Sequence, residues 1–368
     1  MRYAIVVEKA ENNYSAYVPD LPGCITTGYT VEETEREIRE AIEFHIEGLI
    51  EDGLPVPQPA SIVQYIEIAA EVVICYWKNF RGSLDDKKGT RMTLIDHYAV
   101  FGDPVKHSKS PRIHKIFAEQ TGQVLKYKAQ EVPADQFSKA VAAFFANGGK
   151  GLNCTIPLKE LAWAYADVKT ERALMAKAVN TLALQPDGSI LGDNTDGLGL
   201  VADLMSNHGV ILAGSRILIL GAGGASRGIM APLFEQSVQA IVIANRTIDK
   251  AINLAAEFQN QGAITAYGFN DLKGQQFDLI INATSTSLSG QLPPLPEALL
   301  ATNGVCYDLA YSNEPTVFVK WGQENQALKS LDGLGMLVEQ AAEAFFIWRG
   351  IRPKTRPVIE LLNAERKR

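Results

Sequence analysis

Hydrophobic and polar positions follow two different patterns along this chain. Over residues 1–70, short apolar segments between turns predict a strand hairpin, a third strand and a last strand, in the order RYAIVVEKA, NYSAYVPDL, CITTGYT and SIVQYIEIA. Between the third and last strands, apolar residues recur at helical spacing over residues 31–52, and Thr30 with Glu33 forms the T-x-x-E pattern of a helix start. This part is predicted to be a small α+β module.

From residue 98 onward the pattern alternates between buried strands and helices. The first strands are YAVFGD, YKAQEVP and GLNCTIP, with helices expected from about Pro111 and from Asp135, and then two short strands about the Pro-Asp-Gly turn of VNTLALQPDGSILGDNTD. A second series follows, with strands at RILILGAG, AIVIANR, FDLIINATS and GVCYDLAY. Two helices, 335–349 and 356–366, close the chain and are expected to pack back on another part. This alternation is typical of parallel sheets built from βαβ units, so the fold class is α/β.

Changes of pattern set the expected domain boundaries. Residues 71–91 fit neither neighbour, because the polar and charged run RGSLDDKKGTR ends just before Met92. We expect a module at 1–70, a linker at 71–92, one domain made of 93–196 with 334–368, and another at 197–333. Either the chain is expressed as a fused protein, or translation starts at Met92, and the sequence leaves both open.

Composition narrows the class of protein. Of 368 residues, 46% are hydrophobic and 21% charged, which is ordinary for a folded soluble protein. No segment reaches the ~18 uninterrupted apolar residues of a membrane span, and the N-terminus lacks the long apolar core of a signal peptide, so a cytoplasmic location is expected. Four widely spaced cysteines argue against a disulfide framework or a zinc site, and no metal motif is found; they are Cys24, Cys75, Cys154 and Cys306.

A glycine-rich loop follows the strand RILIL. Gly221 permits a tight turn, and Gly223 lets the backbone approach a pyrophosphate at a helix N-terminus. Ser226 stands where the usual fingerprint has a third glycine. The loop consists of Gly221, Ala222, Gly223, Gly224, Ala225 and Ser226. It predicts a dinucleotide site.

The end of the next strand indicates which dinucleotide is bound. An NAD site usually has an acidic residue ~20 residues beyond the glycine loop. This chain has Asn245, Arg246 and Thr247 there, with Lys250 a turn later. Arg246 can pair with a 2′-phosphate and stack on adenine, so NADP is favoured over NAD. The alternative is that Arg246 is simply a solvated side chain at a strand end.

Two residues offer acid–base chemistry. Lys159 follows the segment NCTIPL at a turn from strand to helix, and Asp196 precedes a glycine at another such turn. Taken singly, a lysine of this kind is most often solvated, and an aspartate before a glycine most often caps a helix. Together they supply what carbonyl reduction needs, which is a proton donor held by a carboxylate beside a hydride source.

Residues 97–368 resemble shikimate dehydrogenase throughout. The matching segments, in family order, are YAVFGDPVKHSKSP, GGKGLNCTIPLKE, AVNTL, GDNTDG, GAGGASRG, NRT, DLIINATS and DGLGMLVEQAA. The resemblance implies a Rossmann-type NADP domain and an α/β substrate domain. It also implies reversible NADPH-dependent reduction of 3-dehydroshikimate to shikimate, in chorismate and aromatic amino-acid biosynthesis.

The resemblance also implies roles for individual residues. Lys159 matches the general acid/base and Asp196 its partner. The residues matching substrate ligands are Ser108 and Ser110 for the carboxylate, Thr155, Asn180 and Gln340 for the hydroxyls, and Tyr311 as an aromatic contact. The loop from Gly221 to Ser226 matches the pyrophosphate site, and Asn245, Arg246, Thr247 and Lys250 the adenosine-phosphate site. Leu309 and Gly333 fall at the nicotinamide end. From chemistry alone, Ser110 before a proline is also a candidate helix cap.

Residues 1–70 resemble a HicB-type antitoxin domain. The strand hairpin, the segment PDLPGC, Gly28-Tyr29-Thr30 before an acidic helix, and the ending DGLPVPQP carry the likeness. The family implies a degenerate RNase-H-like fold that neutralises a small basic HicA-type toxin. These residues hold 13 Asp and Glu against 4 Lys and Arg, which suits such a partner, although a solvated acidic helix would explain the charge equally well. The apolar face of helix 31–52 also makes a homodimer a hypothesis.

Three functions remain in competition. The leading one is an NADP-dependent shikimate dehydrogenase carrying an antitoxin-like module. A second is a quinate/shikimate dehydrogenase that uses NAD, against which Arg246 argues. A third is a toxin-binding protein with an incidental dehydrogenase domain, against which the intact pair of Lys159 and Asp196 argues.

Overall fold

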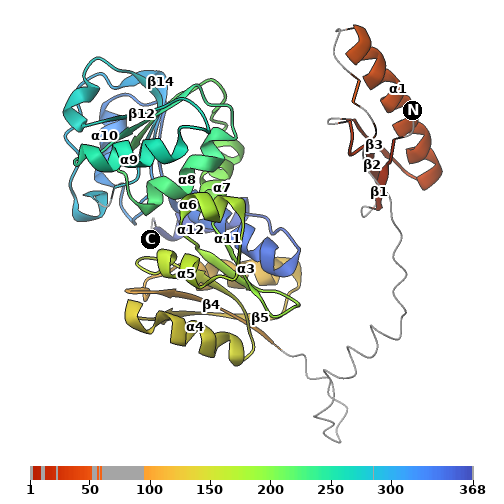
Figure 1. Cartoon of the computed structure of the whole chain (residues 1–368), viewed down its shortest axis with the longest axis horizontal. Helices are drawn as coiled ribbons and strands as arrows, with labels where there is room; N and C mark the ends of the chain where they lie inside the picture. The colour runs from red at the N-terminus through yellow and green to blue at the C-terminus, as the bar shows by residue number, and fades with distance from the viewer. Residues whose placement is uncertain are drawn as a thin grey trace, which may run out of the picture. The chain divides into compact units, whose positions relative to one another are not determined.

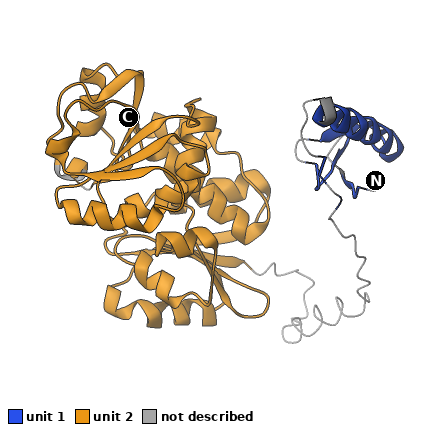
Figure 2. Cartoon of the chain, turned by 45° about the horizontal axis from the view of Figure 1, so that its top comes forward, with its two compact units in different colours: residues 1–90 blue, residues 91–368 orange. Residues whose placement is uncertain are grey.

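The computed structural model describes residues 3–9, 13–21, 24–51, 56, 57, 59, 95–284 and 286–366. The chain forms two compact units, residues 1–90 and 91–368, which are coloured separately in Figure 2 and are treated one at a time below. The predicted strand SIVQYIEIA and the predicted linker 71–91 lie outside the described residues. No described helix is both long enough and apolar enough to cross a membrane.

The described residues of unit 1 form a three-stranded antiparallel sheet and one helix. The strands run in the order β1 (Val6–Lys9), β2 (Tyr14–Tyr17) and β3 (Ile25–Gly28), followed by α1 (Val31–Glu51). The backbone N–H of Glu33 donates to Thr30 Oγ1 at 3.1 Å, so the predicted helix start is confirmed, while the Glu33 carboxylate accepts from the N–H of Tyr29 rather than of Thr30.

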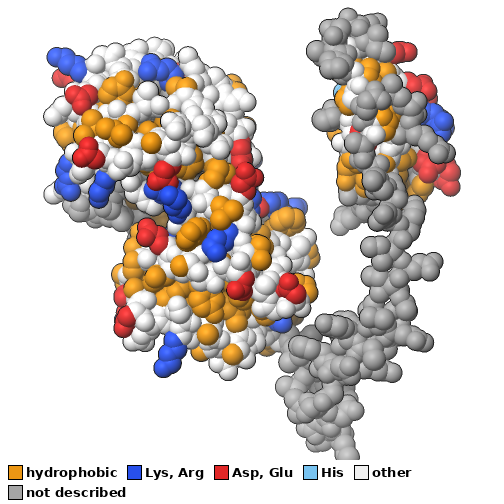
Figure 3. All heavy atoms as spheres, in the orientation of Figure 1, with side chains coloured by type: hydrophobic (Ala, Val, Ile, Leu, Met, Phe, Trp, Pro, Cys, Tyr) orange, Lys and Arg blue, Asp and Glu red, His pale blue; other side chains and the backbone are white. Residues whose placement is uncertain are grey.

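The apolar face of α1 is used inside unit 1. Ile38 is buried against Ala16 and Leu21 from the sheet side, and Ala41, Ile42 and Ile46 pack around the same core. These residues of the apolar face are therefore occupied within unit 1, and self-association through this helix stays a hypothesis. The exposed side of α1 carries Glu32, Glu35, Glu40, Glu43 and Glu47, and Figure 3 shows acidic side chains gathered along one side of unit 1.

Unit 2 contains two six-stranded sheets (Figure 1). The first has the order β5-β4-β6-β8-β9-β7, with bounds Leu125–Glu131, Asp96–Gly102, Gly149–Cys154, Thr181–Leu184, Ile190–Asp193 and Val168–Lys169. Here the expected parallel sheet is mixed. The predicted hairpin forms, and because it reverses the chain, β8 lies antiparallel to both β6 and β9. The helices and the 3₁₀ turn η1 of this half are α3 (Ser110–Thr121), η1 (Ala134–Gln136), α4 (Phe137–Ala146), α5 (Lys159–Tyr165) and α6 (Glu171–Ala176).

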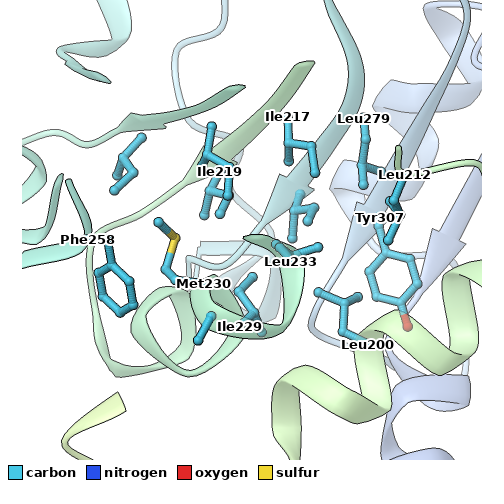
Figure 4. Close-up of a cluster of buried hydrophobic side chains, with 14 of the residues drawn as sticks. Leu200, Leu212, Ile217, Ile219, Ile229, Met230, Leu233, Phe258, Leu279 and Tyr307 are labelled. Atoms are coloured by element: carbon cyan, nitrogen blue, oxygen red, sulfur yellow. The ribbon is translucent and has the colours of Figure 1, made fainter. Parts of the chain in front are cut away.

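The second sheet is parallel throughout, as the βαβ pattern predicts. Its order is β12-β11-β10-β13-β14-β15, with bounds Ile264–Tyr267, Ala240–Ala244, Arg216–Leu220, Phe277–Asn282, Leu300–Asp308 and Lys329–Asp332. The helical elements are α7 (Asp196–Ala202), the π-helical turn η2 (Asp203–Asn207), α8 (Gly224–Phe234), α9 (Ile248–Phe258), η3 (Phe269–Leu272), η4 (Thr286–Ser289) and α10 (Val317–Glu324). Figure 4 shows the buried side of this sheet, where Ile229, Met230 and Leu233 of α8 pack beneath Ile217 and Ile219 of β10.

Three helices meet between the two sheets (Figure 1). They are α7, α8 and the long helix α11 (Leu334–Arg349), which is followed by α12 (Arg356–Arg366). A Cβ on Gly197 of α7 would lie 2.6 Å from Pro232 Cγ of α8, and a Cβ on Gly199 would lie 2.8 Å from the backbone N of Gln340 on α11. Glycine at these two positions therefore lets α7 touch both neighbours.

Candidate active site

The structure brings Lys159 and Asp196 together. Lys159 is the first residue of α5, just after β6, and Asp196 is the first residue of α7, just after β9. The Lys159 ammonium donates to Asp196 Oδ2 at 2.5 Å, and both side chains are partly buried, with 28% and 13% exposed. Two turns from strand to helix, 37 residues apart in sequence, thus meet at one point.

The other oxygen of Asp196 is held by an amide. Asn180 Nδ2 donates to Asp196 Oδ1 at 2.8 Å and to Gln340 Oε1 at 3.1 Å. The orientation of this amide is set from its far side, where Asn180 Oδ1 accepts the backbone N–H of Thr195 at 2.9 Å. Asn180 is 3% exposed, so the amide is preorganised rather than solvated.

These side chains line a cleft of about 570 Å³. Ser108, Ser110, Thr155, Tyr311 and Gln340 also line it, as do Ala225, Leu309 and Gly333 from the nucleotide side. Every residue that the sequence assigns to the substrate therefore borders one cavity. Lys106 and His107, next to Ser108 in the chain, also line the cleft, and the Lys106 ammonium lies 3.9 Å from the Glu131 carboxylate.

Ser110 is not the cap of its helix. It is the first residue of α3 and follows the cap residue Lys109, whose side chain makes no capping bond. The backbone N–H of Ser110 instead donates to Ser108 Oγ at 3.2 Å. The expectation that Ser110 caps this helix is therefore wrong. The hydroxyl that accepts a backbone N–H at the helix start belongs to Ser108, and the N–H that it accepts is that of Ser110.

The glycine loop forms an open anion cradle. Gly221 has φ +106, a conformation that favours glycine, and Ser226 Oγ donates to the Gly221 carbonyl at 2.7 Å, which closes the turn at the position of the missing third glycine. A Cβ at Gly223 or Gly224 would meet nothing within 4 Å, and no side chain caps α8. Free backbone donors at the N-terminus of an 11-residue helix fit a pyrophosphate.

The residues that the sequence assigns to the adenosine phosphate lie outside the cleft, at the end of β11. Arg246, Thr247 and Lys250 are exposed, and neither cation forms an ion pair with another described side chain. Asn245 Nδ2 donates to the Thr247 carbonyl at 2.8 Å and braces the turn. Two unpaired cations beside a braced turn fit a phosphate group.

The comparisons with known proteins agree with this geometry. Residues 100–182 match the shikimate dehydrogenase substrate binding domain, residues 203–289 match shikimate / quinate 5-dehydrogenase, and residues 333–362 match the shikimate 5′-dehydrogenase C-terminal domain. The chain is 63% identical over 276 residues to the shikimate dehydrogenase (NADP(+)) of Methylococcus capsulatus. The matched residues cover 75% of this chain and 99% of that protein. The chain belongs to the shikimate dehydrogenase family.

Further relatives extend this family assignment. The shikimate dehydrogenase (NADP(+)) of Nitrosococcus oceani is 54% identical, over 74% of this chain and 96% of that protein. Among solved structures, an Ael1 enzyme from Pseudomonas putida matches with a TM-score of 0.68 and 45% identity, over 73% of this chain and 98% of that one. The Thermus thermophilus shikimate 5-dehydrogenase in complex with NADP(H) and shikimate matches with a TM-score of 0.65 and 31% identity, over 72% of this chain and 98% of that one.

Unit 1 has a separate match. Residues 3–72 fit the HicB-like antitoxin of bacterial toxin-antitoxin systems. The chain therefore joins an antitoxin-like domain to a member of the shikimate dehydrogenase family, and both resemblances drawn from the sequence are confirmed.

One cleft residue, Asn153, was not predicted from the sequence. Asn153 is 6% exposed and lines the cleft; its Nδ2 donates to the Asn180 carbonyl at 3.0 Å, and its Oδ1 accepts the Tyr127 hydroxyl at 2.7 Å. The available signal was spacing, since residues two apart on a strand share a face and Thr155 follows two positions later. Cys154 lies between them with a thiol whose pKa is raised by burial, so it stays neutral.

The described residues contain no group of three or more His, Cys, Asp or Glu side chains placed to hold a metal ion. Cys24, Cys154 and Cys306 are free and buried.

Proposed function

We infer that residues 91–368 form an NADP-dependent shikimate dehydrogenase, which interconverts 3-dehydroshikimate and shikimate. The observation that carries this function is the Lys159–Asp196 pair, which lies in a cleft bordered by polar side chains on one side and by the dinucleotide loop on the other. Relatives up to 63% identical that are named shikimate dehydrogenase (NADP(+)) support the same activity.

The substrate is held by groups matched to its own polar groups. Ser108 and Ser110, two positions apart, donate to the substrate carboxylate, while Thr155, Asn180 and Gln340 bond the ring hydroxyls. Tyr311 packs against the ring. Buried polar groups built for hydroxyls reject analogues that lack them, by about 10⁴-fold or more in comparable sites.

Lys159 moves the proton. In the direction of reduction, its ammonium donates a proton to the carbonyl oxygen as that oxygen gains negative charge, and in the reverse direction the amine removes the hydroxyl proton. Asp196 holds the ammonium in position through Oδ2 and is itself fixed through Oδ1 by Asn180. Asp196 also accepts from a substrate hydroxyl. When bound, the nicotinamide cofactor supplies or accepts the hydride.

The residues that would hold NADP follow the carboxyl ends of neighbouring strands. The loop from Gly221 to Ser226 takes the pyrophosphate, and Asn245, Arg246, Thr247 and Lys250 take the adenosine with its 2′-phosphate. Leu309 and Gly333 border the nicotinamide. The two unpaired cations described above are the feature that favours NADP over NAD, because the pyrophosphate bound by the cradle is common to both cofactors.

The test is steady-state oxidation of shikimate by the full chain. We expect turnover with NADP⁺ that far exceeds turnover with NAD⁺, and we expect Lys159→Ala to lower kcat by about 10²–10⁴-fold because the proton donor is lost. Lys150→Ala is the matched control, since Lys150 is exposed on the preceding strand, and it should keep full activity. Equal activity of Lys159→Ala and the unmodified chain would contradict the mechanism. Preference for NAD⁺ with quinate would favour the alternative enzyme.

We also propose that unit 1 binds a small basic HicA-type toxin through its acidic surface, with both activities in the cytoplasm. The exposed glutamates of α1 support this, because charge complementarity steers such an association. Titration of a purified HicA-type toxin into the full chain should give binding that weakens with added salt and with Glu40→Lys/Glu43→Lys/Glu47→Lys. Absence of binding, with shikimate oxidation intact, would remove this second role.

A further inference from the structure

Asp308 is a buried acid that the mechanism above does not use. Asp308 is the last residue of β14 and is fully buried. Its carboxylate contacts the end of β13, the loop after β14 and the start of α10. Oδ1 accepts from Asn282 Nδ2 and from the backbone N–H of Ala310, each at 3.1 Å, and Oδ2 accepts from the Thr316 hydroxyl at 2.6 Å. No Lys, Arg or His of the described residues forms an ion pair with it.

The contacts of Asp308 are those of an ionised carboxylate. Thr316 Oγ1 accepts from Val319 N–H, and its own hydrogen is available to Asp308 Oδ2 at 2.6 Å. Ser287 Oγ accepts from Asn282 Nδ2, which leaves the Ser287 hydrogen for the same carboxylate. Burial raises the pKa of Asp308, and these donors oppose that shift. Asn282 Nδ2 and the Ala310 N–H can only donate, and the two hydroxyls can donate as well, so all four partners can stabilise the ionised carboxylate, whose charge no described cation pairs with.

The order of the strands shows which part of a dinucleotide comes near Asp308. The adenosine-phosphate residues follow β11 and the pyrophosphate loop follows β10, and the next strands in the sheet are β13 and β14. A dinucleotide that runs from β11 across β10 therefore brings its other end to the ends of β13 and β14. There Leu309 and Ala310, the two residues after Asp308, line the cleft that holds Lys159.

We propose that the buried Asp308 carboxylate stabilises the positively charged, oxidised nicotinamide ring, so that the enzyme favours NADP⁺ over NADPH by a margin that this charge sets. The inference rests on the proposed dehydrogenase function. The ring is cationic in NADP⁺ and neutral in NADPH, so a fixed anion acts on one form only. An anion without a cationic partner, shielded from water, acts more strongly than a solvated one.

A purely structural role for Asp308 predicts something else. The same hydrogen bonds tie the end of β13, the loop after β14 and the first turn of α10 into one rigid corner. Loosening that corner would weaken both cofactor forms alike, because both forms share the same contacts. The two roles are therefore separated by the ratio of the two affinities and not by either affinity alone.

The experiment measures this ratio in the full chain. The Kd of NADPH comes from the change in its fluorescence on binding, and the Kd of NADP⁺ from its displacement of NADPH. In Asp308→Asn, which keeps the shape and removes the charge, we expect Kd(NADP⁺)/Kd(NADPH) to rise about tenfold. Asp308→Ser is a second neutral variant, in which the same rise is expected.

Two controls isolate the charge. Thr316→Val removes one bond to the carboxylate but leaves its charge, so both affinities should fall together. Asp278→Asn removes an exposed acid at the opposite end of β13 and should leave the ratio unchanged. An unchanged ratio of the two Kd values in both Asp308 variants overturns the inference. A rise of this ratio in either control variant, as large as in the Asp308 variants, also overturns it. If the unmodified chain binds neither cofactor form, the proposed function itself fails, which is a different result.

Discussion

The ring of His114 lies fully buried in α3, stacked on Tyr127 with ring centroids 4.2 Å apart and planes 7° apart. Phe117, Phe345 and Trp348 surround it. Burial lowers the pKa of His114 to about 3, from 6.5 in the unfolded chain. The imidazole is therefore neutral in the folded enzyme at any pH at which it works, and it packs as a flat aromatic ring among these side chains.

His114 should make the enzyme sensitive to acid. Between pH 6.5 and pH 3 the unfolded chain binds a proton at His114 that the folded chain does not, so stability falls as pH falls through this range. From pH 7 to pH 5 the free energy of unfolding should drop by about 2 kcal/mol on this account. In His114→Phe that part of the loss should vanish. Urea unfolding of both proteins at pH 7 and pH 5 measures it, and identical losses would contradict it.

Arg246 should decide between the two nicotinamide cofactors. Because its guanidinium is exposed and paired with no described acid, it is free for a 2′-phosphate. Arg246→Ala should raise KM for NADP⁺ by about tenfold or more, a typical cost for one charge-assisted contact, and leave KM for NAD⁺ unchanged. Arg216, half-buried at the opposite end of the same sheet, offers Arg216→Ala as a control. If Arg246→Ala changed KM for NADP⁺ and KM for NAD⁺ equally, the 2′-phosphate would have to bind elsewhere.

At the scale of elements, α7 connects substrate and cofactor sites. Its first residue is Asp196, Gly197 lies against α8, and Gly199 lies against α11 beside Gln340. A Cβ on Gly199 would also come within 2.8 Å of the Met336 carbonyl, which is backbone and cannot swing aside. The position of Asp196 relative to Gln340 therefore depends on the absence of a side chain at Gly199.

Gly199→Ala should push α7 and α11 apart. Overpacking of this kind costs about 1–3 kcal/mol of folding free energy. Since Gln340 is displaced relative to Asp196, KM for shikimate should rise several-fold more than KM for NADP⁺. Gly48→Ala is the control, because Gly48 lies in α1 and a Cβ there meets nothing within 4 Å. It should leave the kinetics unchanged. If KM for shikimate were unchanged in Gly199→Ala, the prediction would be wrong, and α11 would accommodate the added methyl group without displacing Gln340.

Local patterns predicted most elements, and tertiary contacts explain what they missed. The βαβ alternation predicted four strands of the parallel second sheet, β10, β11, β13 and β14, because each contains a short apolar run. It missed the outer strands β12 and β15, and β15 has the mostly polar sequence KSLD. The mixed first sheet was not predicted, since pattern does not reveal which neighbour β8 pairs with. Ser110 shows the same limit, because whether a hydroxyl caps a helix depends on where the chain turns. Asn153 and Asp308 act through buried hydrogen bonds that no spacing records.

At the scale of the molecule, sequence and structure both separate an N-terminal module from the enzyme. Unit 2 starts at residue 91, one residue before Met92. The domain boundaries proposed inside unit 2, 93–196 with 334–368 and then 197–333, stay a prediction. Each of these two proposed domains contains one six-stranded sheet. The cleft lies where α7, α8 and α11 meet between the two sheets.

A chain that starts at Met92 should keep the full dehydrogenase activity. Every residue assigned to substrate or cofactor lies between Ser108 and Gln340, and the buried clusters around them contain none of the described residues of unit 1. We therefore expect kcat/KM for shikimate and for NADP⁺ to match those of the full chain within about twofold, since sites that share no partners act additively. Lys159→Ala in the shortened chain is the inactive control. A large loss of kcat/KM from truncation alone would mean that unit 1 contributes to the active enzyme.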